Sequence, residues 1–408
     1  MKVEKKIRLY NDEEMDFARN EDKDFANGFY EDKKYYMRVH PLRGLFLEVT
    51  SRCNAHCEHC GSSCGDFIPK DEIEGEEIKK VLKEIYDKNY NTSKIMLHVT
   101  GGEPLLRKDL FDLMKYAKYL GFHWGITSNG MLIDEEMVKK MADAQITSVS
   151  ISIDGPKKIH ESFRQVPGSW EKILHGIKLM QKIPSLQNLQ VTTCVNKKNI
   201  DYLDEIYKTL RELGVKNWRI MEVDPIGRAK DNKEILLSPT EYVRMFNYIA
   251  KMQRENPDMD IVYGCAHFLG MDIEPIVRQR PFNCYTGVCI GCILSNGDIF
   301  VCPDVERRPE FIQGNIRKDS FTEVWETKYK PFRTMNRTIN DKCKKCKDWK
   351  LCMGDAFHTW DFDLNKPRFC HLENIQRYQK TSNKEVKPKK ETKTTKSAKA
   401  KTTKKKTK

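Results

Sequence analysis

The first residues with a clear capacity for chemistry are three closely spaced cysteines, Cys53, Cys57 and Cys60, in the segment SRCNAHCEHC. Three thiolates can hold three irons of a [4Fe–4S] cube and leave the fourth iron open, which suits chemistry better than a fully ligated cube does. The same spacing also suits a zinc knuckle with His56 or His59 as the fourth ligand. The spacing therefore predicts a metal centre and leaves its metal open.

A second motif, GGEP, follows about 40 residues later as Gly101, Gly102, Glu103 and Pro104. Two glycines let the backbone approach a ligand closely, and a glutamate can take up an ammonium group. A lone GGEP is often just a turn. Its place one strand–helix unit after the cysteine motif indicates a ligand site shared by the two motifs.

Cysteine usage points in the same direction along the rest of the chain. Of the fourteen cysteines, four lie within residues 53–64 and eight within residues 284–370. Disulfides are rare in a reducing compartment, so metal binding or catalysis is the leading explanation. The distal eight form two sets of four, either for iron–sulfur clusters or for two zinc sites: Cys284, Cys289, Cys292 and Cys302, then Cys343, Cys346, Cys352 and Cys370.

These motifs need elements that position them, and six short apolar runs supply candidates. The runs cover residues 45–50, 94–100, 123–128, 148–153, 189–195 and 218–223, and the stretches between them have helical spacing. Strands that alternate with helices predict an α/β fold with a parallel sheet of right-handed units. Six units are too few for a closed eight-stranded barrel, so we expect an open, partial (β/α)6 TIM-like barrel. Chemistry in such barrels lies at the C-terminal strand ends, where both motifs fall.

The sequence pattern also predicts how the chain is divided into segments. Residues 1–40 form a helical lead-in, too short for a complete peptide-binding winged-helix module, and residues 41–235 form the partial barrel. A helical linker covers residues 236–280, and a loop-rich Fe–S domain that folds around its metals covers residues 281–375. Residues 384–408 form a disordered, Lys-rich tail, because the segment has almost no apolar residues.

Together, the cysteine motif, the GGEP motif and their order resemble the radical S-adenosylmethionine (SAM) superfamily over about residues 42–230. The resemblance implies that Cys53, Cys57 and Cys60 hold a [4Fe–4S] cluster whose open iron is chelated by SAM. It also implies that Gly101, Gly102, Glu103 and Pro104 bind the methionyl end of SAM. The cluster would then donate an electron, and SAM would cleave to a 5′-deoxyadenosyl radical that abstracts a substrate hydrogen.

Further strand ends match this family less sharply. The alternation in SVSISIDG places Ser150, Ser152 and Asp154 on one face, and the resemblance assigns Ser152 to the ribose of SAM. Arg164 resembles the arginine that pairs with the SAM carboxylate. One departure concerns the residue before the third cysteine, which is usually aromatic and is His59 here. An imidazole can still pack by the adenine.

The distal cysteines resemble the SPASM extension of radical SAM enzymes, which carries two auxiliary [4Fe–4S] clusters. In CKKCKDWKLC the spacing C-x2-C-x5-C matches, but the cysteine expected three residues further on is Ala356. Either the first auxiliary cluster has an open iron, or the additional Cys292 replaces the missing ligand. Thiolate counting favours the replacement.

Three residues are candidates for direct catalytic roles. Cys64 and Cys265 can donate a hydrogen atom to a carbon radical, although a plain loop thiol is the alternative for each. Asp304 can accept the proton released when a substrate radical is oxidised, or it is an ordinary turn residue. Cys194 lies within a strand pattern and is expected in the core.

Bulk composition limits the compartment and the partners. No segment approaches the roughly 20 apolar residues of a membrane span, and the N-terminus resembles no secretory signal, so a cytoplasmic protein is expected. Of the net charge of +13, the tail carries +10, so overall charge is no argument for nucleic acid. The tail is a solvated solubility segment or an arm for an acidic partner, RNA or a membrane surface.

The leading hypothesis is a radical SAM oxidoreductase that modifies a peptide or protein substrate in the manner of ribosomal-peptide maturases. Auxiliary clusters can receive the second electron that many such modifications remove. The alternatives are a sulfatase-maturating, formylglycine-generating enzyme; an RNA- or small-molecule-modifying radical SAM enzyme; and a non-enzymatic metal-binding interaction module. The resemblance further implies an external one-electron reductant such as flavodoxin or ferredoxin.

Overall fold

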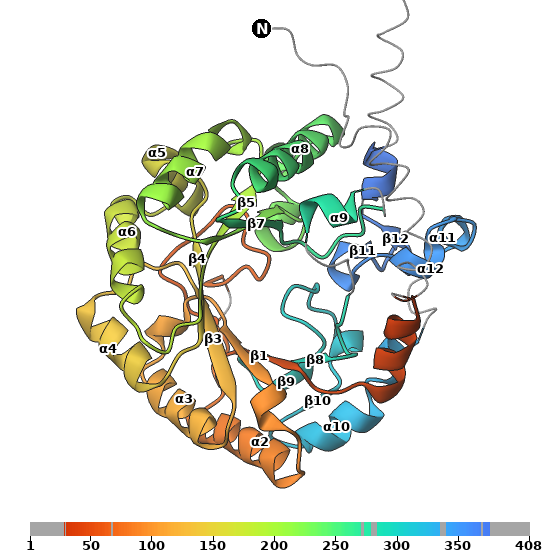
Figure 1. Ribbon diagram of the computed structural model, residues 1–408. Helices are drawn as coiled ribbons and strands as arrows, with labels where there is room; N and C mark the ends of the chain where they lie inside the picture. Colours follow the sequence, from red (N-terminus) through yellow and green to blue (C-terminus); the bar gives the residue numbers. More distant parts are fainter. Residues whose placement is uncertain are drawn as a thin grey trace, which may run out of the picture.

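The computed structural model describes residues 28, 30–66, 68–270, 273–278, 284–334, 340–368 and 370–375. Its centre is a curved parallel sheet in which each strand pairs with the next along the chain (Figure 1). The strands are β1 (Gly44–Glu48), β2 (Met96–Thr100), β3 (His123–Ser128), β4 (Ser148–Ser152), β5 (Asn188–Val195), β6 (Asn217–Glu222) and β7 (Asp260–Tyr263). The predicted partial barrel is confirmed, and its six predicted strands are β1 to β6.

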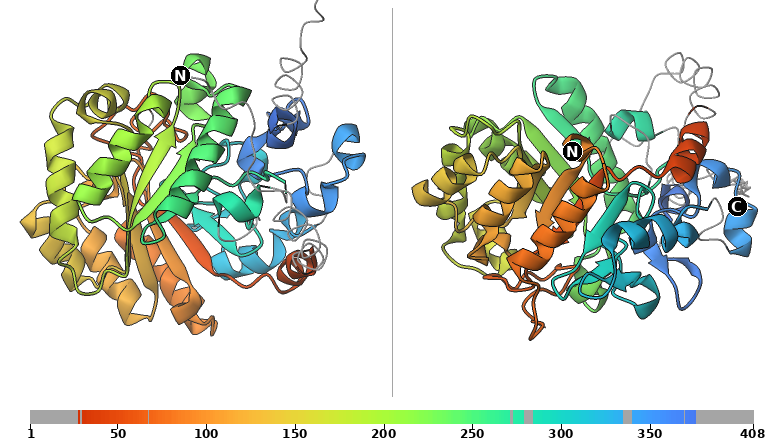
Figure 2. Two further views of the ribbon diagram at one scale, coloured as in Figure 1. Left: turned by 45° about the horizontal axis from the view of Figure 1, so that its top comes forward. Right: turned by 90° about the horizontal axis from the view of Figure 1, so that it is seen from below.

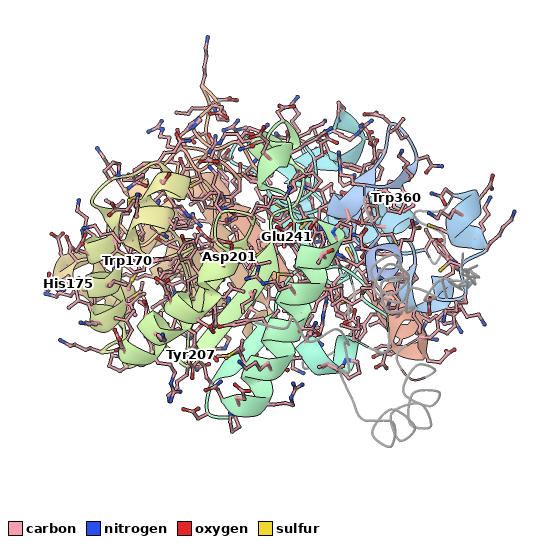
Figure 3. All side chains as sticks on the ribbon, turned by 90° about the horizontal axis from the view of Figure 1, so that it is seen from above. Trp170, His175, Asp201, Tyr207, Glu241 and Trp360 are labelled. Atoms are coloured by element: carbon pink, nitrogen blue, oxygen red, sulfur yellow. The ribbon has the colours of Figure 1, made fainter. Side chains whose placement is uncertain are left out.

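Helices cover the outer face of this sheet. They are α2 (Gly75–Asp87), α3 (Leu110–Tyr119), α4 (Glu135–Asp143), α5 (Lys157–Arg164), α6 (Ser169–Met180), α7 (Leu203–Glu212) and α8 (Pro239–Glu255). Helix α2 shows why: Ile78, Val81, Leu82 and Ile85 form one buried stripe at helical spacing. In Figure 3, Trp170, His175, Tyr207 and Glu241 mark this outer layer, while Trp360 lies in the C-terminal region on the other side.

The segment expected as a helical linker contains more than a helix. Helix α8 starts with a capping box at Ser238 and Glu241, as a Ser-x-x-Glu pattern favours. After α8, residues 260–263 form β7, which pairs with β6 and adds a seventh parallel strand to the barrel. The sequence of β7, DIVY, has only four residues and follows the helix closely, so it shows no strand period that could have been recognised in the sequence.

The C-terminal region continues the barrel sheet. Strand β8 (Ile290–Ile293) pairs in parallel with β1, so that Cys292 lies opposite Phe46. The antiparallel strands β9 (Asp298–Phe300) and β10 (Gly314–Asn315) extend the sheet beyond β8. A hairpin turn lies between β8 and β9, where Gly297 adopts a φ of +86°.

The remaining elements of this region are short. They are α9 (Glu274–Val277), α10 (Phe321–Thr327), α11 (Asp341–Lys344), α12 (Trp349–Cys352), and the small hairpin of β11 (Trp360–Asp361) and β12 (Lys366–Pro367). Short 3₁₀ turns that matter for the site are η2 (Pro104–Leu106), η4 (Gly227–Lys230) and η8 (Phe357–Thr359). Loop-rich structure was expected here, where no apolar period extends far.

The end of the predicted lead-in segment is helical over residues 30–39 and packs on the C-terminal region (Figure 2). Lys33 donates to the carbonyl of Leu351, and the ring of Tyr36 meets that of Tyr285 edge-on at 5.7 Å. Residues 1–27 of the predicted lead-in, and the predicted tail, lie outside the described residues. Among the described helices, none has the length and apolar character of a membrane span.

Candidate active site

The loop that follows β1 holds the first cysteine motif at the C-terminal edge of the sheet. Cys57 is buried, and Cys53 and Cys60 are half-buried. Burial, together with the neighbouring charges of Cys57 and Cys60, raises the pKa of Cys53 to about 11. Burial likewise raises the pKa of Cys57. Three clustered thiolates therefore need a cation, which fits the iron cluster expected at this loop.

A hydrogen-bond network holds the cysteine loop in place from within and from η4. A hydrogen bond with Cys64 lowers the pKa of Cys60 to about 5, and the Cys64 thiol points to the carbonyl oxygen of Gly101 at 3.5 Å. Arg228 donates from Nε to the carbonyl of Cys57 at 2.8 Å and from Nη1 to that of Cys64 at 3.2 Å. Sequence reasoning missed Arg228, because nothing in PIGRAK distinguishes it from a surface arginine.

The GGEP motif packs directly against this loop. The N–H of Gly102 donates to the carbonyl of Thr50 at 2.9 Å, and that of Glu103 donates to Arg52 at 2.8 Å. A Cβ on Gly101 would lie 2.2 Å from the Thr50 oxygen, and one on Gly102 would lie 2.2 Å from the Arg52 oxygen. Only glycine therefore allows the two strand ends to approach this closely.

Glu103 is completely buried and is surrounded by neutral donors. Its carboxylate accepts from the Ser128 hydroxyl at 2.9 Å, from the Asn129 backbone N–H at 2.8 Å and from the Leu105 N–H at 3.2 Å. Burial raises its pKa to about 7 against the lowering effect of these hydrogen bonds. A buried carboxylate without a paired cation is suited to an ammonium group of a ligand. Ser128 and Asn129, at the C-terminal end of β3, position it.

Arg164 links the cysteine loop to β4. Its Nε donates to the buried carboxylate of Asp154 at 2.6 Å, and its Nη1 lies 3.7 Å from the Cys57 sulfur. Burial raises the pKa of Asp154, but Arg164 and the nearby histidines outweigh this effect and leave it lowered. The second Asp154 oxygen accepts from the Cys194 N–H at 2.8 Å. Asp154 thus fixes the guanidinium beside the cysteine motif.

The predicted polar face of β4 is present. Ser150 and Ser152 alternate with buried Val149 and Ile151, and the Ser150 hydroxyl lies 2.8 Å from that of Thr192 on β5. Ser152 lies half-buried at the C-terminal end of β4, two residues before Asp154. Its assignment to the ribose stays a prediction.

His59 packs rather than reaching toward solvent. Its ring stacks on Phe163 with centroids 4.4 Å apart and an interplanar angle of 5°. Burial lowers its pKa to about 3, so the imidazole is neutral at neutral pH. Its Nδ1 is buried and has no hydrogen-bond partner among the described residues. The ring thus occupies the aromatic position as a flat, uncharged surface. His56 instead is exposed and pairs with Asp66 at 2.9 Å.

The second distal set of cysteines is brought together. Cys343, Cys346, Cys352 and Cys370 all line one cavity of about 680 Å³ between α11, α12 and the chain near residue 370. Cys370, which is 18 positions beyond Cys352 in the sequence, therefore reaches the same site as the C-x2-C-x5-C run. The donor set fits a tetrathiolate metal centre.

The first distal set is arranged around the β8–β9 hairpin. Burial raises the pKa of Cys292 and of Cys302; the charge of Cys302 acts on Cys292, and that of Cys284 acts on Cys302. Cys289 is buried in a small cluster with Met37, Val288 and Met353. Ala356, where the family pattern has a cysteine, is completely buried. The identity of the fourth ligand stays a prediction.

The three candidates for direct catalysis are separated in space. Cys64 lies in the cysteine loop beside Gly101, as described above. Cys265 follows β7, and its sulfur lies 3.6 Å from the carboxylate of Asp224. Asp304 is exposed in the turn after β9. Their catalytic roles stay predictions.

Comparison with protein families matches two parts of the chain. The model of the "Radical SAM superfamily" matches residues 47–220, which contain the first cysteine motif and GGEP. The model SPASM, an "Iron-sulfur cluster-binding domain", matches residues 284–347. Cys352 and Cys370 lie beyond the second match, although they line the same cavity as Cys343 and Cys346.

Curated relatives fall into two groups by name. The AdoMet-dependent heme synthase of Methanosarcina barkeri is 29% identical over 76% of this chain and 90% of its own length. The cysteine-type anaerobic sulfatase-maturating enzyme of Clostridium perfringens is 25% identical over 80% of this chain and 93% of its own.

Solved structures share the fold. The enzyme anSMEcpe with bound AdoMet superposes with a TM-score of 0.66 at 21% identity, covering 84% of this chain and 96% of its own. Streptococcus suis SuiB bound to precursor peptide SuiA gives a TM-score of 0.64 at 17% identity, covering 83% and 78%.

Proposed function

Because the chain is a radical SAM enzyme with a C-terminal SPASM domain, we propose that it modifies a peptide or protein substrate after abstracting a hydrogen atom from it. Its cofactors are S-adenosylmethionine and [4Fe–4S] clusters. The observation that carries the proposal is the packing of the Cys53, Cys57 and Cys60 loop against GGEP, with the buried Glu103 carboxylate behind it.

The described residues fit these cofactors. Three cysteines lie in one loop at one strand end, where burial raises the pKa of Cys53, and a cradle closed to any Cβ lies at the next strand end. We assign Cys53, Cys57 and Cys60 to the catalytic cluster, and Gly101, Gly102 and Glu103 to the methionyl ammonium. When bound, the cluster and SAM supply a one-electron reductive cleavage that yields a 5′-deoxyadenosyl radical.

The chain's own residues contribute orientation and charge to this chemistry. Ionised Glu103 holds the ammonium end of the ligand, with Ser128 and Asn129 fixing the carboxylate. Arg164, held by Asp154, presents a cation beside Cys57 for the ligand carboxylate. Stacked His59 offers a neutral face for the adenine. A rigid, preorganised site of this kind aligns a reactive group with a substrate bond.

Three curated relatives support a peptide or protein substrate. They are the mycofactocin maturase MftC at 26% identity, the PqqA peptide cyclase at 23% and the sulfatase-maturating enzyme at 25%, and each match covers at least three quarters of this chain. In every case the matched part of this chain includes residues of both the barrel and the SPASM domain. The sulfatase-maturating enzyme is named for its action on a protein, so a sulfatase-type substrate falls within the proposed class of peptide or protein substrates.

A second candidate is a metal porphyrin substrate. The relative with 29% identity is an AdoMet-dependent heme synthase, and an Fe-coproporphyrin III synthase of the same organism is 25% identical over 75% of this chain. These identities are close to those of the peptide-acting relatives. Substrate class is therefore the point that the first experiment must resolve.

The experiment uses anaerobically reconstituted full-length protein with dithionite and SAM. A peptide encoded beside the gene is supplied with deuterium at candidate positions, and 5′-deoxyadenosine is examined by mass spectrometry. Deuterium in 5′-deoxyadenosine and a mass change in the peptide support the proposal. The matched arm supplies Fe-coproporphyrin III instead. Turnover of the porphyrin with no turnover of any peptide would reject the peptide proposal, and no 5′-deoxyadenosine in either arm would reject the catalytic site.

A further inference from the structure

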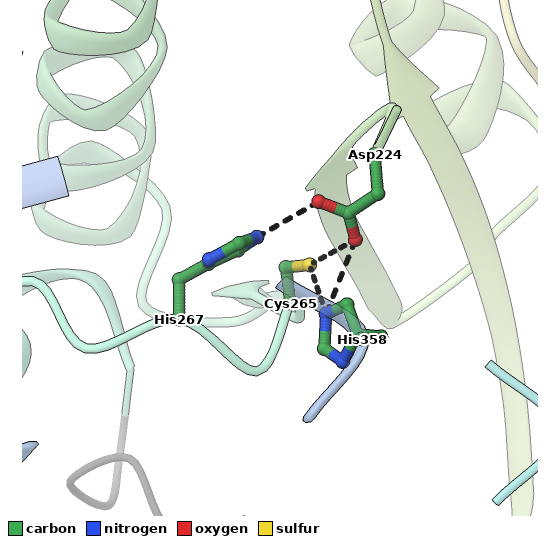
Figure 4. A group of neighbouring side chains, drawn as sticks. All are labelled: Asp224, Cys265, His267 and His358. Atoms are coloured by element: carbon green, nitrogen blue, oxygen red, sulfur yellow. Dashed lines mark hydrogen bonds and ion pairs between the residues drawn. The ribbon is translucent and has the colours of Figure 1, made fainter. Parts of the chain in front are cut away.

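A group of metal-ligating side chains includes none of the cysteines of the three sets. Asp224 follows β6, Cys265 and His267 follow β7, and His358 belongs to η8 in the C-terminal region (Figure 4). Cys265 and His267 are buried, and the side chains of Asp224 and His358 are each only 10% exposed. One ligand atom from each side chain lies within 4.8 Å of those of the others.

Three of these atoms have the spacing of ligands on one ion. Asp224 Oδ2 lies 3.1 Å from His358 Nε2 and 3.6 Å from Cys265 Sγ, and the sulfur lies 4.0 Å from His358 Nε2. Metal–nitrogen and metal–oxygen bonds of about 2.0–2.1 Å and a metal–sulfur bond of about 2.3 Å place tetrahedral ligands about 3.3–3.6 Å apart. The observed separations of 3.1, 3.6 and 4.0 Å differ from that spacing by at most about 0.5 Å, so small side-chain shifts would bring the three atoms onto one ion.

His267 is oriented as a fourth ligand. Its Nε2 faces the cluster, 2.9 Å from Asp224 Oδ1, and its other nitrogen, Nδ1, lies 3.3 Å from the carboxylate of Asp355. Asp355 is itself fixed, since it accepts from the Phe268 N–H at 2.9 Å. A carboxylate on the far nitrogen is the usual support of a metal-bound histidine.

We propose that Asp224, Cys265, His267 and His358 form a closed site for one divalent transition-metal ion of the zinc type. A mixed set of one thiolate, two imidazoles and one carboxylate is suited to zinc and not to magnesium or calcium. The thiolate and the carboxylate balance its charge, and binding displaces the protons held by the Cys265 thiol and by the two imidazoles. Four protein ligands leave no open position, so the ion is structural.

Such an ion would join parts that are remote in sequence. It would tie the C-terminal ends of β6 and β7 to η8, which is 91 residues beyond His267 in the chain. The proposal also gives Cys265 a role other than the hydrogen-atom donor expected from sequence, because a metal-bound thiolate has no S–H to donate. It does not depend on the substrate class.

The test uses full-length protein that has been reconstituted anaerobically with iron and sulfide, given one equivalent of zinc and desalted. We expect one zinc per chain by elemental analysis. Zinc K-edge absorption, which is blind to iron, should report one sulfur at about 2.3 Å and three nitrogen or oxygen ligands at about 2.0–2.1 Å. Cys265→Ser and His358→Gln should each lower zinc affinity at least about tenfold, and Asp355→Asn should lower it about tenfold through His267.

The matched control is Cys194→Ser, another inward cysteine on a neighbouring strand, which should retain zinc. Iron content serves as the folding check for every variant. Absence of retained zinc would overturn the proposal. A shell of four sulfurs would do the same, since it would place the zinc in a cysteine set. If a variant fails to retain its iron, the absorption spectrum of the wild-type protein decides alone.

Discussion

Arg164 donates to Asp154 over 2.6 Å while its Nη1 lies 3.7 Å from the sulfur of Cys57. The arginine comes from the end of α5, the aspartate from the end of β4, and the cysteine from the loop after β1. One buried ion pair therefore joins three strand–helix units at the point where the cysteine motif lies. The effect expected of a substitution at Arg164 depends on this ion pair.

Arg164→Lys should lower the rate of 5′-deoxyadenosine formation about 10- to 100-fold, because a lysine cannot hold Asp154 and reach Cys57 together. The measurement is single-turnover cleavage of SAM with iron content checked. Lys157→Ala, an exposed change on the same helix, is the control and should turn over normally. A wild-type rate of SAM cleavage in Arg164→Lys would contradict the assignment of Arg164 to the active site.

Affinity for SAM should fall as the pH drops through 7. Burial raises the pKa of Glu103 to about 7, and only the ionised carboxylate attracts an ammonium. Between pH 8 and pH 6 the ionised fraction falls about tenfold, so the Kd should rise about tenfold. Equilibrium binding over this range measures it. In Glu103→Gln the affinity should be weaker and level with pH; an equal pH slope in that variant would contradict the assignment.

Gly101→Ala should destabilise the protein by at least about 2–3 kcal/mol, because the new Cβ would lie 2.2 Å from the Thr50 carbonyl oxygen at a φ of +149°. Gly168→Ala also sits at positive φ, but it meets nothing within 4 Å and should cost only about 1–2 kcal/mol. Thermal unfolding of the two variants gives the comparison. Equal losses of stability in the two variants would show that the positive φ alone, and not the contact with Thr50, causes the destabilisation.

His59→Phe should keep SAM cleavage within about threefold of wild type, because the stacked ring acts as a neutral face and burial lowers its pKa to about 3. His59→Ala should weaken SAM binding. A zinc knuckle that uses His59 predicts the opposite, with the Phe variant losing its metal. Metal analysis alongside the cleavage assay distinguishes the two.

Iron should reach about twelve per chain after reconstitution, as three [4Fe–4S] clusters require. Replacing Cys343 and Cys346 together should remove about four irons and leave the remaining eight. The pair lines the 680 Å³ cavity with Cys352 and Cys370, so it should not affect the cysteines at β1. Retention of all twelve irons would show that this cavity holds none of them.

Much of the fold could be predicted because each parallel strand has its own apolar run. The run at 123–128 coincides with β3, and the other five agree with their strands within two residues at each end. The cysteine motif and GGEP were expected to meet, and hydrogen bonds from Gly102 and Glu103 to the cysteine loop show that they do. The two motifs meet because they follow neighbouring parallel strands, whose C-terminal ends lie at the same edge of the sheet.

Other contacts have no local signal. Arg228 and Cys57 of the cysteine loop lie 171 positions apart in the chain, and His358 meets Asp224 across 134 positions. Tertiary folding alone creates such pairs. The pairing of β8 with β1 depends on an open barrel edge that no residue pattern reveals.

That pairing of β8 with β1 has a mechanical consequence. Cys292 on β8 and the loop leading to Cys53 extend from two strands joined by one ladder of backbone hydrogen bonds, with no hinge between them. For the proposed clusters, the distance over which an electron tunnels would be set by the spacing of these neighbouring strands. Any movement of the barrel against the C-terminal region at this edge would have to break that ladder.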